Sequence, residues 1–76
     1  GYGCYDIAVA NILADVIMPL SKVIAPHIKK GGLFISSGII DMKEKDVVDT
    51  IKANSDFEII EVNHQGEWVS VTARRL

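Results

Sequence analysis

The sequence predicts an α/β fold, half of a doubly wound sheet in which the elements follow the order β-α-β-α-β-β. Three observations predict it. An early apolar run is continuous rather than alternating, as in parallel strands that are covered on both faces. Two segments with helical spacing of apolar residues are separated by a second short apolar strand. The chain then ends in two β-rich segments joined by a short turn, which indicates an antiparallel hairpin.

Composition excludes several classes of protein. With 49% hydrophobic residues and a formal net charge of -2, the 76-residue chain is too apolar for a disordered segment. Like charges occur only in pairs, so we expect no direct nucleic-acid partner and no membrane surface. No apolar run reaches the ~18 residues of a membrane-spanning helix. Cys4 is the only cysteine and lies in no Cys/His cluster, so we expect neither a disulfide framework nor a metal site. A packed, soluble, cytoplasmic protein is the class that remains.

The start of the chain indicates a piece of a larger protein. There is no initiating methionine and no signal peptide, and Gly1–Cys4 leads almost directly into a strand. We therefore expect residues 1–76 to be one partial domain.

The first strand and the first helix are predicted from the apolar pattern. Tyr5–Ala10 is the expected strand, and the following apolar residues form one helical stripe. Asp15 is the expected N-cap, and Pro19 and Pro26 predict a kinked or two-piece helix. Lys29–Gly32 is expected to end that helix, with two cations at the negative end of the dipole followed by two glycines. The stripe consists of Leu13, Val16, Ile17, Leu20, Val23, Ile24 and Ile28.

A second strand and a second helix follow. Leu33–Ser37 is the expected strand, and it runs into Gly38. Asp41 and Glu44 have the spacing of a capping box, and they predict a helix that continues to about Asn54.

The last two strands are expected to form a hairpin. Phe57–Val62 and Trp68–Ala73 are rich in β-branched and aromatic residues. Asn63–Glu67 between them contains a glycine available for a positive φ, so this segment is the expected turn.

Candidate binding residues lie where the parallel strands end. In open α/β sheets, ligands bind outside the carboxyl ends of the strands, here Asn11–Asp15 and Ser36–Asp41. Asn11 carries an amide that could read the polar edge of a ligand, and by position alone a local turn or cap is the simpler role.

Other polar and aromatic residues suggest no specific chemistry. Ser36 and Ser37 are not in a Gly-x-Ser-x-Gly elbow, and we predict no Ser-hydrolase site. His27 and His64 have no ligand-spaced partners in the sequence and are expected at the surface. Gly31 and Gly32 lack the dinucleotide-binding pattern. A large aromatic in a small chain is more often core, and we expect this of Trp68.

Three segments together resemble the C-terminal part of the bacterial ribosomal protein L eleven methyltransferases (PrmA type). The resemblance covers nearly all of the chain, and the combination is specific because the segments follow the order and spacing of the family. The segments are Tyr5–Asp15, which ends in Asn-Ile-Leu-Ala-Asp, Lys30–Ile40, which reads Lys-Gly-Gly-Leu-Phe-Ile-Ser-Ser-Gly-Ile-Ile, and Gly66–Val69, which reads Gly-Glu-Trp-Val.

The resemblance implies a fold, a cofactor and a substrate. The fold would be the C-terminal half of a Rossmann-like class-I methyltransferase sheet, with this chain supplying strands four to seven of seven. The cofactor would be S-adenosylmethionine, and the substrate would be amino groups of a large-subunit ribosomal protein. Asn11 matches the place of the Asn-Pro-Pro-Tyr motif of other amino-group methyltransferases, so the resemblance makes it a cofactor-binding residue; no catalytic residue is assigned.

The chain departs from the family in what it lacks. The Gly-rich cofactor loop, the acidic ribose-binding residue and the N-terminal substrate domain are absent from the sequence. We therefore expect the 76-residue fragment to be inactive by itself. The strand around Ile7–Val9 would present an open edge, which predicts self-association or partial disorder.

Two alternatives to a methyltransferase fragment remain. One is a free-standing α/β binding module, such as a signalling receiver-like domain. Against it, Asp6 begins a strand, whereas a receiver's acceptor Asp stands at a strand's C-terminal end. The other is a structural subunit that completes the sheet of another chain by edge pairing, without catalysis.

Overall fold

Four strands form the framework of the protein in the computed structural model, which describes residues 5–11 and 14–76. They are β1 (Tyr5–Asn11), β2 (Ile28–Ile40), β3 (Phe57–Gln65) and β4 (Trp68–Arg75). The predicted strands are confirmed, and all four extend beyond their expected bounds, β2 and β3 by the most. The expectations for Cys4, Ile12 and Leu13 concern positions outside the described residues.

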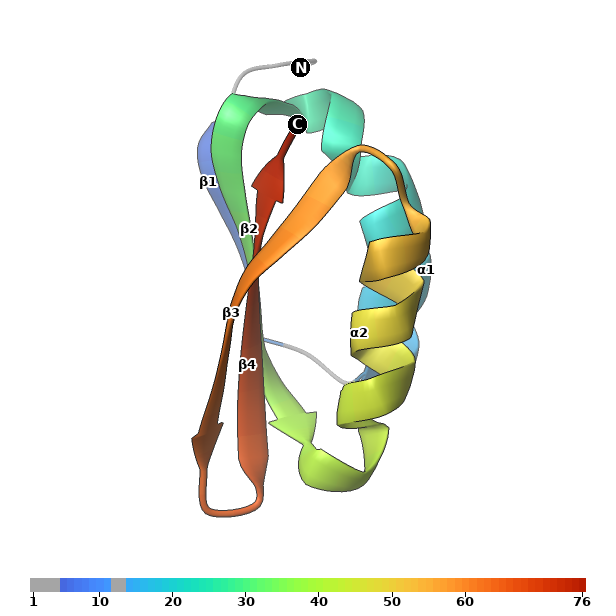
Figure 1. Ribbon diagram of the computed structural model, residues 1–76, viewed down its shortest axis with the longest axis vertical. Helices are drawn as coiled ribbons and strands as arrows, with labels where there is room; N and C mark the ends of the chain where they lie inside the picture. Colours follow the sequence, from blue (N-terminus) through green and yellow to red (C-terminus); the bar gives the residue numbers. More distant parts are fainter. Residues whose placement is uncertain (1–4, 12–13) are drawn as a thin grey trace.

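The strands form one mixed sheet in the order β1-β2-β4-β3. β1 and β2 are parallel, and the β2/β4 and β3/β4 pairs are antiparallel. The carboxyl ends of β1 and β2 therefore lie at the same edge of the sheet as the turn of the β3–β4 hairpin (Figure 1). The Asp41 amide donates a hydrogen bond of 2.9 Å to the Glu67 carbonyl, which ties the end of β2 to that turn.

Two helices cover one face of the sheet (Figure 1). α1 (Ala14–Ile24) follows β1, and α2 (Glu44–Ala53) follows β2. Each is continued or preceded by a 3-10 turn, η1 (Ala25–His27) after α1 and η2 (Asp41–Lys43) before α2. In the described part of the chain, no helix has the length and apolar character needed to cross a membrane.

The core lies between the helices and the sheet, and its residues alternate along β2 and β4 as expected for strands with one covered face. The Phe34 and Phe57 rings pack with centroids 5.6 Å apart. The largest fully buried side chains are Phe34, Ile17, Ile28, Ile39, Ile51, Val47, Val69, Val71, Ser21 and Ser36.

The first helix ends earlier than predicted. The α-helix stops at Ile24, and Pro26 lies in η1, so the expected two-piece helix is confirmed. The expected stop at Lys29–Gly32 is wrong, because this segment belongs to β2. The helical segment has already ended at His27, before these residues, and Lys29 instead forms an exposed ion pair with Asp6 of β1 at 3.5 Å.

The predicted capping residues do not cap. Asp15 lies inside the first turn of α1, one residue after the helix begins, so it is not the N-cap. The Asp41–Glu44 capping box is also absent, because Asp41–Lys43 forms η2 and the N-cap of α2 is Lys43, which makes no side-chain capping bond. Asp15 in the first turn of α1 and Glu44 in the first turn of α2 still complement the dipoles of their helices.

β1 is covered on one face only, which corrects the expectation of a strand covered on both. Ala10 faces the helices and is buried, whereas Tyr5, Ile7 and Val9 on the other face are 51, 53 and 66% exposed. β1 is also an edge strand of the described sheet, so the predicted open edge is confirmed.

Candidate functional site

The candidate site is the end of the sheet toward which the carboxyl ends of the parallel strands β1 and β2 point. Asn11, the last residue of β1, is exposed and pairs in parallel register with Ser37 of β2. β1 and β2 both run toward this end of the sheet and both helical connections leave from it, which is where ligands bind in open α/β sheets. The structure thus places Asn11 where the sequence predicts, at a strand end beside a second strand end.

Gly38 follows Ser37 and lies against the Asn11 side chain. Its φ is +74°, in the left-handed region. The pairing of β2 with β4 shifts register between Ser36 and Ile39, which marks a β-bulge around this glycine. The bulge interrupts the β2/β4 ladder beside the carboxyl end of β1.

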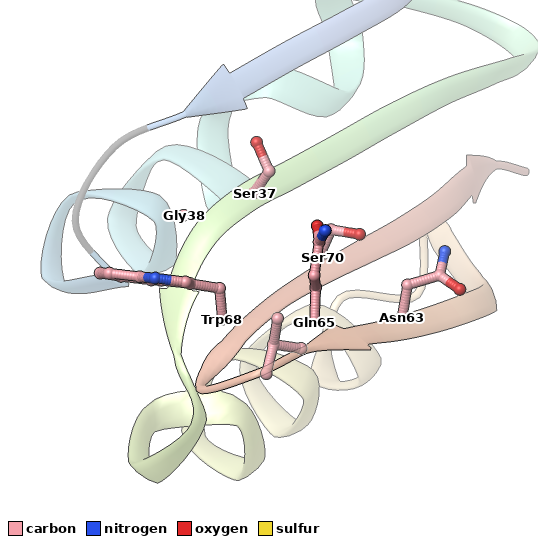
Figure 2. Close-up of a pocket in the computed structure, with 7 residues that line it drawn as sticks. Ser37, Gly38, Asn63, Gln65, Trp68 and Ser70 are labelled. Carbon is pink, nitrogen blue, oxygen red and sulfur yellow. The ribbon is translucent and has the colours of Figure 1, made fainter.

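A small pocket of about 160 Å³ lies next to this bulge. Ser37, Asn63 and Ser70 project to the same side of the sheet, and the Trp68 indole lies at the end nearest the turn (Figure 2). Register explains the grouping, because Asn63 is paired with Ser70 and Gln65 with Trp68. The lining residues are Ser37, Gly38, Asn63, Gln65, Trp68, Val69 and Ser70.

The pocket offers hydrogen bonds and an aromatic face, and none of its seven lining side chains is a carboxylate, amine or imidazole. Hydroxyls and carboxamides both donate and accept, so they suit uncharged polar groups of a ligand. The indole supplies a flat apolar surface that also attracts cations. Chemistry at this edge would therefore rest on positioning rather than on a strong general base from these seven residues.

Trp68 is not core, which corrects the prediction. It is 54% exposed, because it begins β4 on the face opposite the helices, whereas the next residue, Val69, is 2% exposed. Successive side chains of β4 point to opposite faces of the sheet, so the position of Trp68 along the strand, rather than its size, determines its exposure.

Sequence reasoning missed three lining residues. Asn63 and Gln65 were expected in a turn, but β3 continues to Gln65 and only Gly66 and Glu67 separate the strands. The sequence predicts that Ser70 lies in a strand, and no sequence feature assigns it a function. Polar residues at every second position, 63 and 65 on β3 and 70 and 72 on β4, were the available signal for one polar sheet face.

The remaining polar candidates lie away from the pocket. Ser36 is fully buried on the helix side of β2. His27 is partly buried, and His64 is half-exposed, its Nε2 lying 2.5 Å from the Glu44 Oε1 of α2. The expectation of a surface position is confirmed for His64, and its partner was missed because 20 residues separate the two in sequence. Among residues 5–11 and 14–76, no cluster of three or more His, Cys, Asp or Glu could hold a metal ion.

The strand order and a solved structure together identify the class of protein. A parallel pair flanked by an antiparallel hairpin, with the last strand inserted next to the pair, is the fold of the class-I methyltransferases. The crystal structure of a ribosomal protein L11 methylase from Lactobacillus delbrueckii subsp. bulgaricus superposes on it with a TM-score of 0.85 and 28% sequence identity, over 92% of this chain and 36% of that one.

Within that class, the chain belongs to the ribosomal protein L11 methyltransferase (PrmA) family, whose model matches residues 2–76. It is 60% identical over 75 residues to a ribosomal protein L11 methyltransferase of Lachnospira eligens, covering 99% of this chain and 24% of the relative. It is 58% identical over 72 residues to the one of Agathobacter rectalis, covering 95% of this chain and 22% of the relative. The chain thus spans about a quarter of the length of these relatives.

Proposed function

We propose that this chain is the C-terminal half of an S-adenosylmethionine-dependent methyltransferase domain that modifies amino groups of ribosomal protein L11, in the cytoplasm. Family membership carries the methyltransferase class and the ribosomal substrate, since both relatives bear that name. The observation that supports a half-domain is that the face of β1 and β2 opposite the helices is apolar but uncovered. Apolar residues cover both faces of these strands, but helices cover only one.

The two edges of the sheet support the same proposal. The β3 edge carries Glu58 and Glu61, and its pairing with β4 shifts register between Ile59 and Glu61. Charges and bulges are the features that keep natural edges from pairing. β1 lacks a bulge beyond Ile7 and exposes Ile7 and Val9, so it has the features of an interior strand. We propose that further strands of the parent domain pair with it, and that the isolated chain self-associates there and is inactive.

We assign Asn11 to cofactor binding near the transferred methyl group. Its support is its place at the carboxyl end of β1, beside the pocket-lining Ser37. Methyl transfer to an amine needs a neutral nucleophile in line with a sulfonium carbon, and an oriented amide can position reactants without acting as a base. The polar, uncharged lining of the pocket is compatible with this chemistry.

Calorimetric titration with S-adenosylmethionine tests the assignment in the natural protein that carries this chain. Loss of an oriented hydrogen-bonding group costs about 1–2 kcal/mol, so Asn11→Ala is expected to weaken binding roughly tenfold. Lys52→Ala, on the exposed face of α2, serves as the control and should bind as the wild type does. Equal affinity in the Asn11 and Lys52 variants would exclude Asn11 from the cofactor site.

A further inference from the structure

Two separate physical constraints favour glycine at position 38, and the second of them involves the side chain of Asn11. The first is its φ of +74° within the β-bulge of β2, a conformation that L side chains rarely adopt. The second is space. A Cβ placed on Gly38 would lie 2.5 Å from the Asn11 Oδ1 and 3.7 Å from the Asn11 Cγ. The carboxamide of Asn11 therefore occupies the volume that a side chain at 38 would need.

The other glycines of the described chain with positive φ show that this contact is specific. Gly31 has a φ of +85° and Gly66 a φ of +62°, and a Cβ on either would meet nothing within 4 Å. These two glycines satisfy a backbone requirement alone. At Gly38, the need for a positive φ occurs together with a second constraint, the contact with the exposed Asn11 side chain of the neighbouring strand β1.

We propose that Gly38 is a positioning residue for Asn11: the bulge and the missing Cβ together seat the Asn11 carboxamide over β2 at the carboxyl edge of the sheet. An exposed asparagine would otherwise sample several rotamers. Packing against Gly38 restricts it, so the amide is oriented before a ligand arrives and less ordering remains for binding. The inference rests on the proposed function of Asn11 only for its effect on S-adenosylmethionine.

The first arm of the test measures the side chain directly and needs no ligand. In the natural protein labelled with ¹⁵N-asparagine, the Asn11 side-chain amide is expected to have an order parameter of about 0.8, against values below about 0.6 for a mobile group. Exposed Asn63 is the internal comparison. A mobile Asn11 amide in the wild type would overturn the proposal, and this measurement does not depend on any variant folding.

The second arm compares Gly38→Ala with Gly31→Ala. Both substitutions place alanine at positive φ, so both should raise the unfolding equilibrium constant by a similar factor, about tenfold. Only Gly38→Ala should shift the Asn11 side-chain amide resonances, because only there does a methyl group displace the carboxamide. Unchanged Asn11 resonances in folded Gly38→Ala, or an equal change in Gly31→Ala, would overturn the proposal.

The third arm connects position to affinity. Gly38→Ala should weaken S-adenosylmethionine binding about as much as Asn11→Ala, and the double variant should bind no more weakly than Asn11→Ala alone, since both act through one group. Additive losses would overturn the proposal, because Gly38 would then act by another route. If the Asn11 resonances shift but neither variant changes affinity, the positioning role stands and the cofactor role of Asn11 fails.

Discussion

Two buried serines of this chain differ in how their hydroxyls are satisfied. The Ser21 hydroxyl, on α1, donates a hydrogen bond of 2.7 Å to the Met18 carbonyl. Ser36 is equally buried, on the strand between Ala10 and Val71, and its Oγ has no hydrogen-bond partner among the described residues. An unsatisfied buried hydroxyl costs free energy that a methyl group of similar size does not.

Ser36→Ala is therefore expected to raise the free energy of unfolding by up to about 1 kcal/mol. Ser21→Ala is the matched control, because it removes a hydroxyl that is buried to the same extent but is hydrogen-bonded, and it should not stabilise. Urea denaturation of the natural protein measures both changes through the midpoints at constant slope. Destabilisation by Ser36→Ala would show that the Ser36 hydroxyl has a partner in the folded protein.

At the scale of elements, the helices are held to the sheet by one buried face each and by a few polar bonds at their ends. Ile17 of α1 and Ile51 of α2 are 0 and 1% exposed. The Asn54 side-chain amide, just after α2, donates a hydrogen bond of 3.0 Å to the Ser21 carbonyl of α1. Arg75 at the end of β4 donates from Nε to the Ala25 carbonyl at 2.8 Å, which anchors the 3-10 turn η1.

Neighbouring residues of α1 should respond very differently to truncation. Ile17→Ala leaves a cavity in the core and is expected to lower the free energy of unfolding by about 2–5 kcal/mol. Val16→Ala, at a residue that is 49% exposed, should change it by less than about 0.5 kcal/mol in either direction. Thermal melts of the two variants provide the measurement. Comparable effects would mean that α1 is rotated from the orientation described.

On the scale of the whole molecule, the sheet has one protected and one unprotected edge. β3 is bulged around Ile60 and carries two glutamates, whereas β1 exposes apolar residues along an open ladder. Unpaired amide and carbonyl groups on a flat apolar edge are a template for another strand. The isolated chain is therefore expected to associate through β1.

Sedimentation velocity of the isolated 76-residue chain tests this expectation. The wild-type chain should form larger species as its concentration rises, and Val9→Lys should reduce them, since lysine on an edge strand opposes pairing. Ile60→Lys, at an exposed residue of the β3 edge, should leave association unchanged. A wild-type chain that remains monomeric at all concentrations would refute association through this edge.

The element order, the hairpin, the family and the strand end that holds Asn11 can all be predicted from the amino-acid sequence. These features depend on apolar periodicity and local motifs, which short stretches of chain carry in full. The end of the first helix was predicted less well, because Lys29–Gly32 has the composition of a helix stop but lies within β2, between the paired residues Ile28 and Leu33. Which face of each strand is covered depends on how the helices pack against the sheet, and this packing leaves Trp68 exposed and Ser36 buried. The grouping of Asn63 and Gln65 with Ser70, and the contact between Gly38 and the Asn11 side chain, could not be predicted from the sequence. Both depend on strand register, which is set by pairing between segments distant in sequence.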